Sequence, residues 1–121
     1  MANKILLVED HEEIWDFLSR RLKRRGFDVV IAQDGQQGLD MARAENPNVI
    51  LLDMNLPVMD GWTFREIQGS DPALQTIPVV IISAISNVQQ QRHPVPAAAY
   101  LPKPLNFALL LETVTRFCCP P

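Results

Sequence analysis

The sequence contains no long hydrophobic run. None of its apolar stretches exceeds five residues, whereas a helix needs about 20 apolar residues to cross a bilayer. The first residues, Met1-Ala2-Asn3-Lys4, also lack the apolar segment of a signal peptide and lead directly into a predicted strand. We therefore expect a cytoplasmic protein that does not associate with a membrane.

Cysteine is scarce, and basic residues are not in excess. The two cysteines, Cys118 and Cys119, are adjacent near the C-terminus, with no other cysteine to pair with for a structural disulfide. The formal net charge of −3 argues against a general nucleic-acid-binding protein. With 121 residues, 47% of them hydrophobic, the chain has the size and composition of one globular domain over residues 1–121.

The short apolar stretches that are present lead into reactive side chains. Residues 5–8 precede Glu9 and Asp10, residues 49–52 precede Asp53, residues 79–82 precede Ser83, and residues 97–101 precede Pro102 and Lys103. Runs of this length, bounded by turn residues, are typical of strands buried on both faces. Parallel strands bring their carboxyl ends to one edge of the sheet, where open α/β folds place their sites.

Helical patterns alternate with these strands. Apolar residues recur at helical spacing after the first strand, Asp34 and Asp60 each precede a glycine that opens a helix, and Asn106 is a predicted N-cap of the last helix. Together with a strand at 29–32, the alternation predicts a doubly wound, five-stranded parallel sheet. Pro94 and Pro96 break the fourth helix, which we expect to be short or irregular.

The acidic residues predict a magnesium site beside a nucleophile. Asp53 can attack phosphorus to form an acyl phosphate, although a lone aspartate after a strand more often braces a loop or caps a helix. Glu9 and Asp10 would repel Asp53 unless a cation lay among them, and Mg²⁺ suits a few carboxylate oxygens with bound water. Alternatively, Asp10 and Glu13 form a capping box at the start of the first helix.

Ser83 and Lys103 complete the predicted site. The Ser83 hydroxyl could hydrogen-bond a phosphoryl oxygen, but many serines at strand ends have no such role. Lys103 lies between Pro102 and Pro104, where an ammonium would offset the charge of a phosphorylated Asp53. A cis peptide bond between Lys103 and Pro104 would direct this side chain inward.

These motifs together resemble the receiver domain of two-component response regulators. The resemblance rests on Glu9-Asp10, on Asp53 in Asp-Met-Asn-Leu-Pro-Val-Met-Asp-Gly, on Ser83-Ala84 and on Tyr100-Leu101-Pro102-Lys103-Pro104. It implies a flavodoxin-like (βα)5 fold with strand order 2-1-3-4-5. It also implies Asp53 as phosphoacceptor and Mg²⁺ held by Asp10, Asp53, the Asn55 carbonyl and, through water, Glu9. Ser83 and Lys103 would contact the phosphoryl group, and the Tyr100 rotamer would follow the state of Ser83.

The resemblance implies a phospho-accepting signalling switch rather than an enzyme with an external substrate. A histidine kinase or histidine phosphotransfer protein would phosphorylate Asp53, and the altered face at Ser83 and Tyr100 would control a downstream protein target. We expect a monomer or weak dimer without an output domain. The alternatives are a non-phosphorylated pseudo-receiver that binds proteins, a flavin-binding module and a phosphohydrolase. His11 and Trp15 are candidate contacts for the phosphodonor.

Overall fold

A computed structural model of the chain describes residues 3–54, 59, 61–83 and 97–118. Five strands form one parallel sheet in the order β2-β1-β3-β4-β5, which confirms the predicted fold class and strand order. The strands are β1 (Lys4–Val8), β2 (Asp28–Ala32), β3 (Val49–Asp53), β4 (Val79–Ser83) and β5 (Ala99–Pro102). The predicted fourth helix lies outside the described residues.

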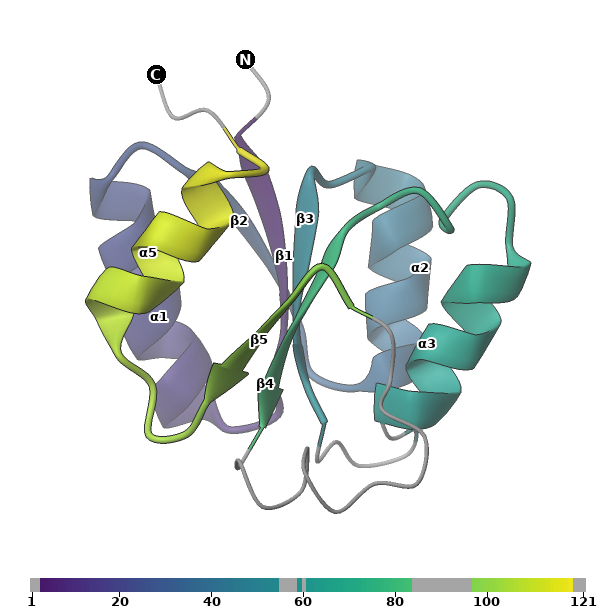
Figure 1. The fold of residues 1–121 in the computed structure, drawn as a ribbon, viewed down its shortest axis with the longest axis horizontal. Helices are drawn as coiled ribbons and strands as arrows, with labels where there is room; N and C mark the ends of the chain where they lie inside the picture. Colours follow the sequence, from purple (N-terminus) through teal and green to yellow (C-terminus); the bar gives the residue numbers. More distant parts are fainter. Residues whose placement is uncertain (1–2, 55–58, 60, 84–96, 119–121) are drawn as a thin grey trace.

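Helices cover both faces of the sheet (Figure 1). The helices within the described residues are α1 (Glu12–Arg24), α2 (Gly35–Glu45), α3 (Gly61–Ser70) and α5 (Phe107–Thr115). Helices α1 and α5 lie on one face, and α2 and α3 lie on the other. Because successive strand residues point to opposite faces, Ile5 and Leu7 enter the core under α1 and α5, whereas Leu6 and Val8 enter the core under α2 and α3.

Local capping explains where two of the helices begin. The Asp34 carboxylate accepts a hydrogen bond from the Gln37 backbone N–H at 2.8 Å, and Asn106 Oδ1 accepts one from the Leu109 backbone N–H at 3.1 Å. The predicted Asn106 cap is therefore confirmed, and the helix predicted to open at Asp34-Gly35 has Asp34 as its cap. The alternative role of Asp10 as the cap of the first helix is wrong, because α1 begins after His11, which is its N-cap and makes no side-chain capping bond.

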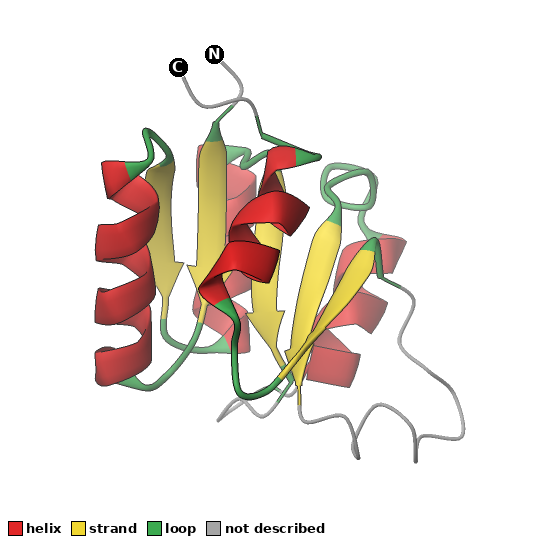
Figure 2. Cartoon of the chain, turned by 60° about the vertical axis from the view of Figure 1, so that its left-hand side comes forward, coloured by secondary structure: helices red, strands yellow, loops and turns green. Residues whose placement is uncertain are grey.

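The strand register places the carboxyl ends of the strands together. Val8 pairs with Leu52, Asp53 pairs with Ile82, and Ser83 pairs with Pro102. Figure 2 shows the strands side by side between the helix layers, with their carboxyl ends toward the same edge. The residues that follow the strands therefore share one edge of the sheet, as the parallel order requires.

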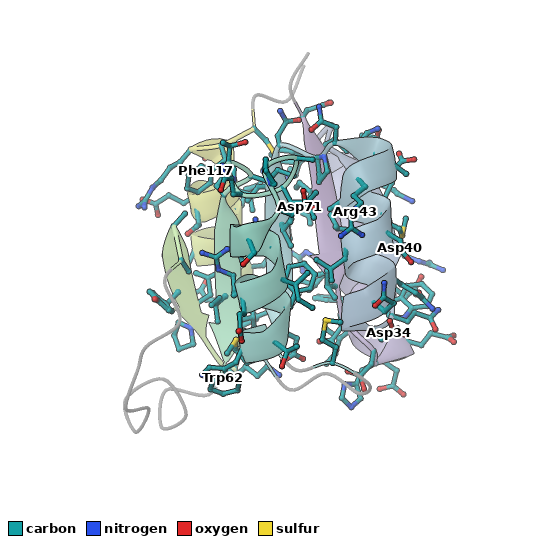
Figure 3. The ribbon with its side chains drawn as sticks, turned by 90° about the vertical axis from the view of Figure 1, so that its right-hand side faces the viewer. Asp34, Asp40, Arg43, Trp62, Asp71 and Phe117 are labelled. Carbon is teal, nitrogen blue, oxygen red and sulfur yellow. The ribbon has the colours of Figure 1, made fainter. Side chains whose placement is uncertain are left out.

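Helices α2 and α3 are joined at the surface and in the core. Arg43 on α2 lies beside Asp71, which follows α3, with 3.2 Å between Nε and Oδ2 (Figure 3). An exposed ion pair of this kind contributes little stability. The closer contact is in the core, where Gly38 of α2 allows Phe64 of α3 and Val8 of β1 to approach its backbone.

We expect Gly38→Ala to destabilise the fold by about 1–3 kcal/mol, because overpacking a dense core forces neighbours to move. The new Cβ would lie 2.9 Å from Phe64 Cε2 and 3.0 Å from Val8 Cγ2, and both side chains are fully buried. Urea unfolding measures the change.

Gly69→Ala is the matched control, because Gly69 also lies in a helix but a Cβ added there would have nothing within 4 Å. This variant should be neutral or more stable by about 0.5–1 kcal/mol, since alanine favours helix over glycine. Equal effects of the two substitutions would contradict close packing at Gly38.

Candidate functional site

Three carboxylates meet at the carboxyl edge of the sheet. Asp53 is the last residue of β3, and Glu9 and Asp10 follow β1. Together with His11 they offer ligand atoms that all lie within 4.8 Å of one another. Asp53 is 1% exposed and Glu9 is 3% exposed. The structure thus brings together the three acidic residues that the sequence placed at one edge.

Glu9 is held in an environment that disfavours its ionised form. Burial, followed by the charge of Asp53, raises the Glu9 pKa from 4.5 to about 7. The His11 backbone N–H donates a hydrogen bond to Glu9 Oε2 at 3.2 Å, which opposes the rise in pKa. A carboxyl group with such a pKa retains a proton over much of the range in which an exposed glutamate is ionised. Ionisation of Glu9 is therefore energetically unfavourable when no cation is bound at the site.

His11 contributes a nitrogen to the same cluster. Its Nδ1 lies 3.3 Å from Glu9 Oε2 and 3.2 Å from Asp10 Oδ1. The hydrogen bond with Glu9 and the charge of Asp10 raise the His11 pKa. The sequence named His11 as a candidate contact for a phosphodonor and missed its place in the acidic cluster. Its position directly after Asp10, at the start of a helix, is the signal that could have indicated it.

Lys103 supplies a positive charge beside Asp53. Its Nζ donates a hydrogen bond to Asp53 Oδ2 at 3.2 Å, and the Lys103–Pro104 peptide bond is cis. The lysine side chain is 33% exposed, whereas that of Asp53 is 2% exposed. An ion pair with one buried partner is screened less by water and salt than a surface pair. The fold thus places Lys103 at the predicted site, although it lies 50 residues from Asp53 in the sequence.

The remaining predicted residues are placed only in part. Ser83 ends β4, opposite Pro102 of β5, but its side chain lies outside the described part of the structure. Asn55 also lies outside the described residues. Tyr100 lies on β5, where its side chain is 41% exposed. The metal role of Asn55 and the switch roles of Ser83 and Tyr100 remain predictions.

The donor set fits a divalent cation. Glu9, Asp10 and Asp53 provide carboxylate oxygens, the ligands that hard divalent ions prefer. Asp10 Oδ1 is buried and, although it lies near His11 Nδ1, accepts no hydrogen bond from any described residue. An ion would provide the partner that this buried oxygen lacks, and its charge would reduce the repulsion among the acids.

An apolar groove of about 330 Å³ adjoins this cluster. Glu9 and Lys103 of the site are among its lining residues, and so are Phe17 and Phe107. The Arg21 guanidinium lies over both rings, with its Cζ 5.2 Å from the centre of Phe17 and 4.3 Å from that of Phe107. The groove joins α1 to the start of α5 beside the carboxylates.

Comparison with known proteins identifies the family. Residues 5–115 match the response regulator receiver domain. The chain is 35% identical over 115 residues to the transcriptional regulatory protein YxdJ of Bacillus subtilis, an alignment covering 93% of this chain and 48% of that protein. The chain therefore belongs to the response regulator receiver family of two-component signalling, whose members are phospho-accepting switches rather than enzymes of the usual kind. It spans about half the length, or less, of the curated relatives it matches.

Solved structures agree with this assignment. The receiver domain of the sensor histidine kinase PA1611 from Pseudomonas aeruginosa, which has a magnesium ion coordinated in its active-site cleft, is 27% identical. The alignment has a TM-score of 0.86 and covers 97% of this chain and 98% of that one. The chemotaxis response regulator CheY4 of Vibrio cholerae is 28% identical, with a TM-score of 0.86 and coverages of 97% and 99%.

A search of the described residues for membrane spans found no helix with the length and hydropathy needed to cross a bilayer.

Glu9→Gln should stabilise the metal-free protein increasingly as the pH rises. In the wild type, the folded pKa of Glu9 is raised from 4.5 to about 7, so between these values the unfolded chain has already released a proton that the folded chain keeps. Stability is therefore lost as the pH rises through this window, by up to roughly 3 kcal/mol above it. The amide variant does not have this loss.

Urea unfolding of both proteins in chelator, at about pH 5 and about pH 8, measures the difference. Glu66→Gln, which removes an exposed glutamate of α3, controls for the change in net charge. A stability difference between Glu9→Gln and wild type that stays the same at both pH values would contradict the buried, protonated Glu9.

Proposed function

We propose that this receiver domain is phosphorylated on Asp53 in a reaction that depends on Mg²⁺. The observation that carries the proposal is the meeting of Asp53 with two further acids and with the Lys103 ammonium. A buried carboxylate beside a cation site and an ammonium is suited to accept a group that itself carries negative charge. No described feature of the site favours an external substrate.

The reaction is a transfer of a phosphoryl group to oxygen. A carboxylate oxygen of Asp53 forms the new bond to phosphorus while the bond from phosphorus to the leaving atom of the donor breaks, and the leaving atom keeps the electron pair. Asp10, Asp53 and the Asn55 carbonyl would hold Mg²⁺, with Glu9 acting through water. When bound, the ion supplies positive charge to the phosphoryl oxygens.

Lys103 has a second role once the phosphoryl group is in place. In the unphosphorylated protein its Nζ pairs with Asp53 Oδ2. The phosphoryl group adds close to two negative charges, and the ammonium can move to a phosphoryl oxygen without leaving the edge of the sheet. The Ser83 hydroxyl would take another phosphoryl oxygen. Movement of these two groups would couple phosphorylation to the face that carries Tyr100.

Two surfaces are proposed for partner proteins. A histidine kinase or histidine phosphotransfer protein would approach the carboxyl edge, where the apolar groove and the exposed Phe17 offer a contact beside Asp53. The downstream protein target would bind the face around Tyr100, whose side chain is exposed on the edge strand β5. The two partners would thus meet the domain on different elements.

Incubation with Mg²⁺ and acetyl phosphate, followed by intact mass measurement, tests the proposal. We expect the wild type to gain a single phosphoryl group and Asp53→Asn to gain none, because the amide is a poor nucleophile. Chelation of the ion should abolish the gain. Asp28→Asn is the matched control, since Asp28 is an exposed aspartate at the opposite end of the parallel strands.

A folded wild-type protein that gains no phosphoryl group would reject the proposal and favour a pseudo-receiver that acts by binding proteins. A gain that persists in Asp53→Asn would place the modification on another residue. Circular dichroism of each variant establishes that the fold is retained.

Lys103→Met should bind Mg²⁺ more tightly by about two- to tenfold, because the variant removes a positive charge that repels the ion. Its phosphorylation by acetyl phosphate should nevertheless fall, because the phosphoryl group loses its ammonium partner. Titration calorimetry measures the first effect and intact mass measures the second.

Lys4→Met provides the comparison, because Lys4 pairs with Glu45 at 3.0 Å and is similarly exposed, but lies at the other end of β1. It should leave both quantities unchanged. Weaker Mg²⁺ binding by Lys103→Met would show that the lysine supports the ion rather than opposing it.

A further inference from the structure

We propose that His11 is a nitrogen ligand of the cation site, and that this chain therefore binds late first-row divalent ions such as Ni²⁺ through a mixed nitrogen and oxygen centre. The inference rests on the cation site of the proposed function but concerns a residue to which that function gives no role. It predicts that the preference for Ni²⁺ over Mg²⁺ depends on one imidazole.

The geometry places the imidazole nitrogen within the ligand group. Nδ1 of His11 lies 3.3 Å from Glu9 Oε2 and 3.2 Å from Asp10 Oδ1, and the cluster that includes Asp53 spans no more than 4.8 Å. Donor atoms bonded at about 2.1 Å to one ion lie roughly 3 to 4.2 Å apart. The four residues therefore need only small side-chain movements to share an ion.

The backbone of His11 is fixed while its ring is free to adjust. The His11 N–H donates to Glu9 Oε2, and its carbonyl accepts hydrogen bonds from the backbone N–H groups of Ile14 and Trp15 at 3.0 Å each. These bonds anchor the residue as the N-cap of α1. The side chain is 64% exposed, so core packing does not hold the ring away from the carboxylates.

The chemistry of the donors separates the ions. Mg²⁺ favours oxygen ligands and keeps several waters, so an imidazole adds little to its binding. Imidazole suits Ni²⁺, Cu²⁺ and Zn²⁺, whose affinities for mixed sites also exceed those of earlier divalent ions. The carboxylates alone would give some preference for Ni²⁺. The contribution of His11 is therefore measured as the part of the preference for Ni²⁺ over Mg²⁺ that is lost when the imidazole is removed.

Calorimetric titration of the metal-free protein with Ni²⁺ and, separately, with Mg²⁺ tests the inference. His11→Asn should lower Ni²⁺ affinity about tenfold or more and change Mg²⁺ affinity less than about threefold. Asparagine is a strong N-cap, so the start of α1 is retained. His93→Asn removes the other of the two histidines in the sequence, and the inference expects it to change neither affinity.

A second readout is the magnetic resonance spectrum of the histidine rings. Substoichiometric Ni²⁺ should broaden the ring signals of His11 before those of His93, because a paramagnetic ion relaxes the nuclei of its ligands. Asp10→Asn should remove this selective broadening and weaken binding of both ions, which would place Ni²⁺ at the same centre as Mg²⁺.

The proposal is overturned if His11→Asn leaves Ni²⁺ affinity unchanged, lowers the two affinities by the same factor, or if Ni²⁺ does not bind the wild type. These outcomes are separate from the phosphorylation test. Asp53 phosphorylation with Mg²⁺ and no effect of His11→Asn would leave the proposed function intact and reject the nitrogen ligand. Selective loss of Ni²⁺ binding in His11→Asn, together with a wild type whose Asp53 is not phosphorylated, would support the nitrogen ligand and reject the proposed function.

Discussion

The ion pair between Lys103 and Asp53 is the interaction on which the site depends. Asp53 is buried at the end of β3 beside Glu9 and Asp10, and burial of so many acids in one place is unfavourable without compensating charge. Lys103, 3.2 Å from Asp53, provides part of that charge. Glu9 has a raised pKa, first because it is buried and second because of the charge of Asp53. A bound cation and a retained proton would each reduce this cost.

The sheet makes this crowding possible. Strands β1 and β3 are central and buried on both faces, so their side chains fill two separate cores and their ends are held in register. Glu9 and Asp10 follow β1 directly, Asp53 is the last residue of β3, and Lys103 follows the edge strand β5. The groove lined by Glu9 and Lys103 is also lined by Phe17, which places an apolar contact near the charged groups.

Much of this arrangement could be predicted from the sequence, because buried parallel strands are read from short apolar runs and the acids lie directly after them. The caps at Asp34 and Asn106 were also predictable, since each depends on a side chain bonding to a backbone group three residues away. Only the alternative role of Asp10, as a cap, was wrong. Its spacing to Glu13 fits a capping box, but α1 begins after His11, and Asp10 lies with Glu9 and Asp53. The place of His11 in that cluster was missed, because it depends on Asp53, far along the chain.

The position of Lys103 also makes the charge balance of the site depend on the whole sheet. Glu9 and Asp10 follow β1 and Asp53 ends β3, whereas Lys103 follows the edge strand β5, which pairs with β4. A domain of this size folds as a unit, so the acids and their ammonium come together only when the sheet is complete. Loss of β5 from the edge would therefore leave a buried carboxylate without its cation as well as expose apolar surface.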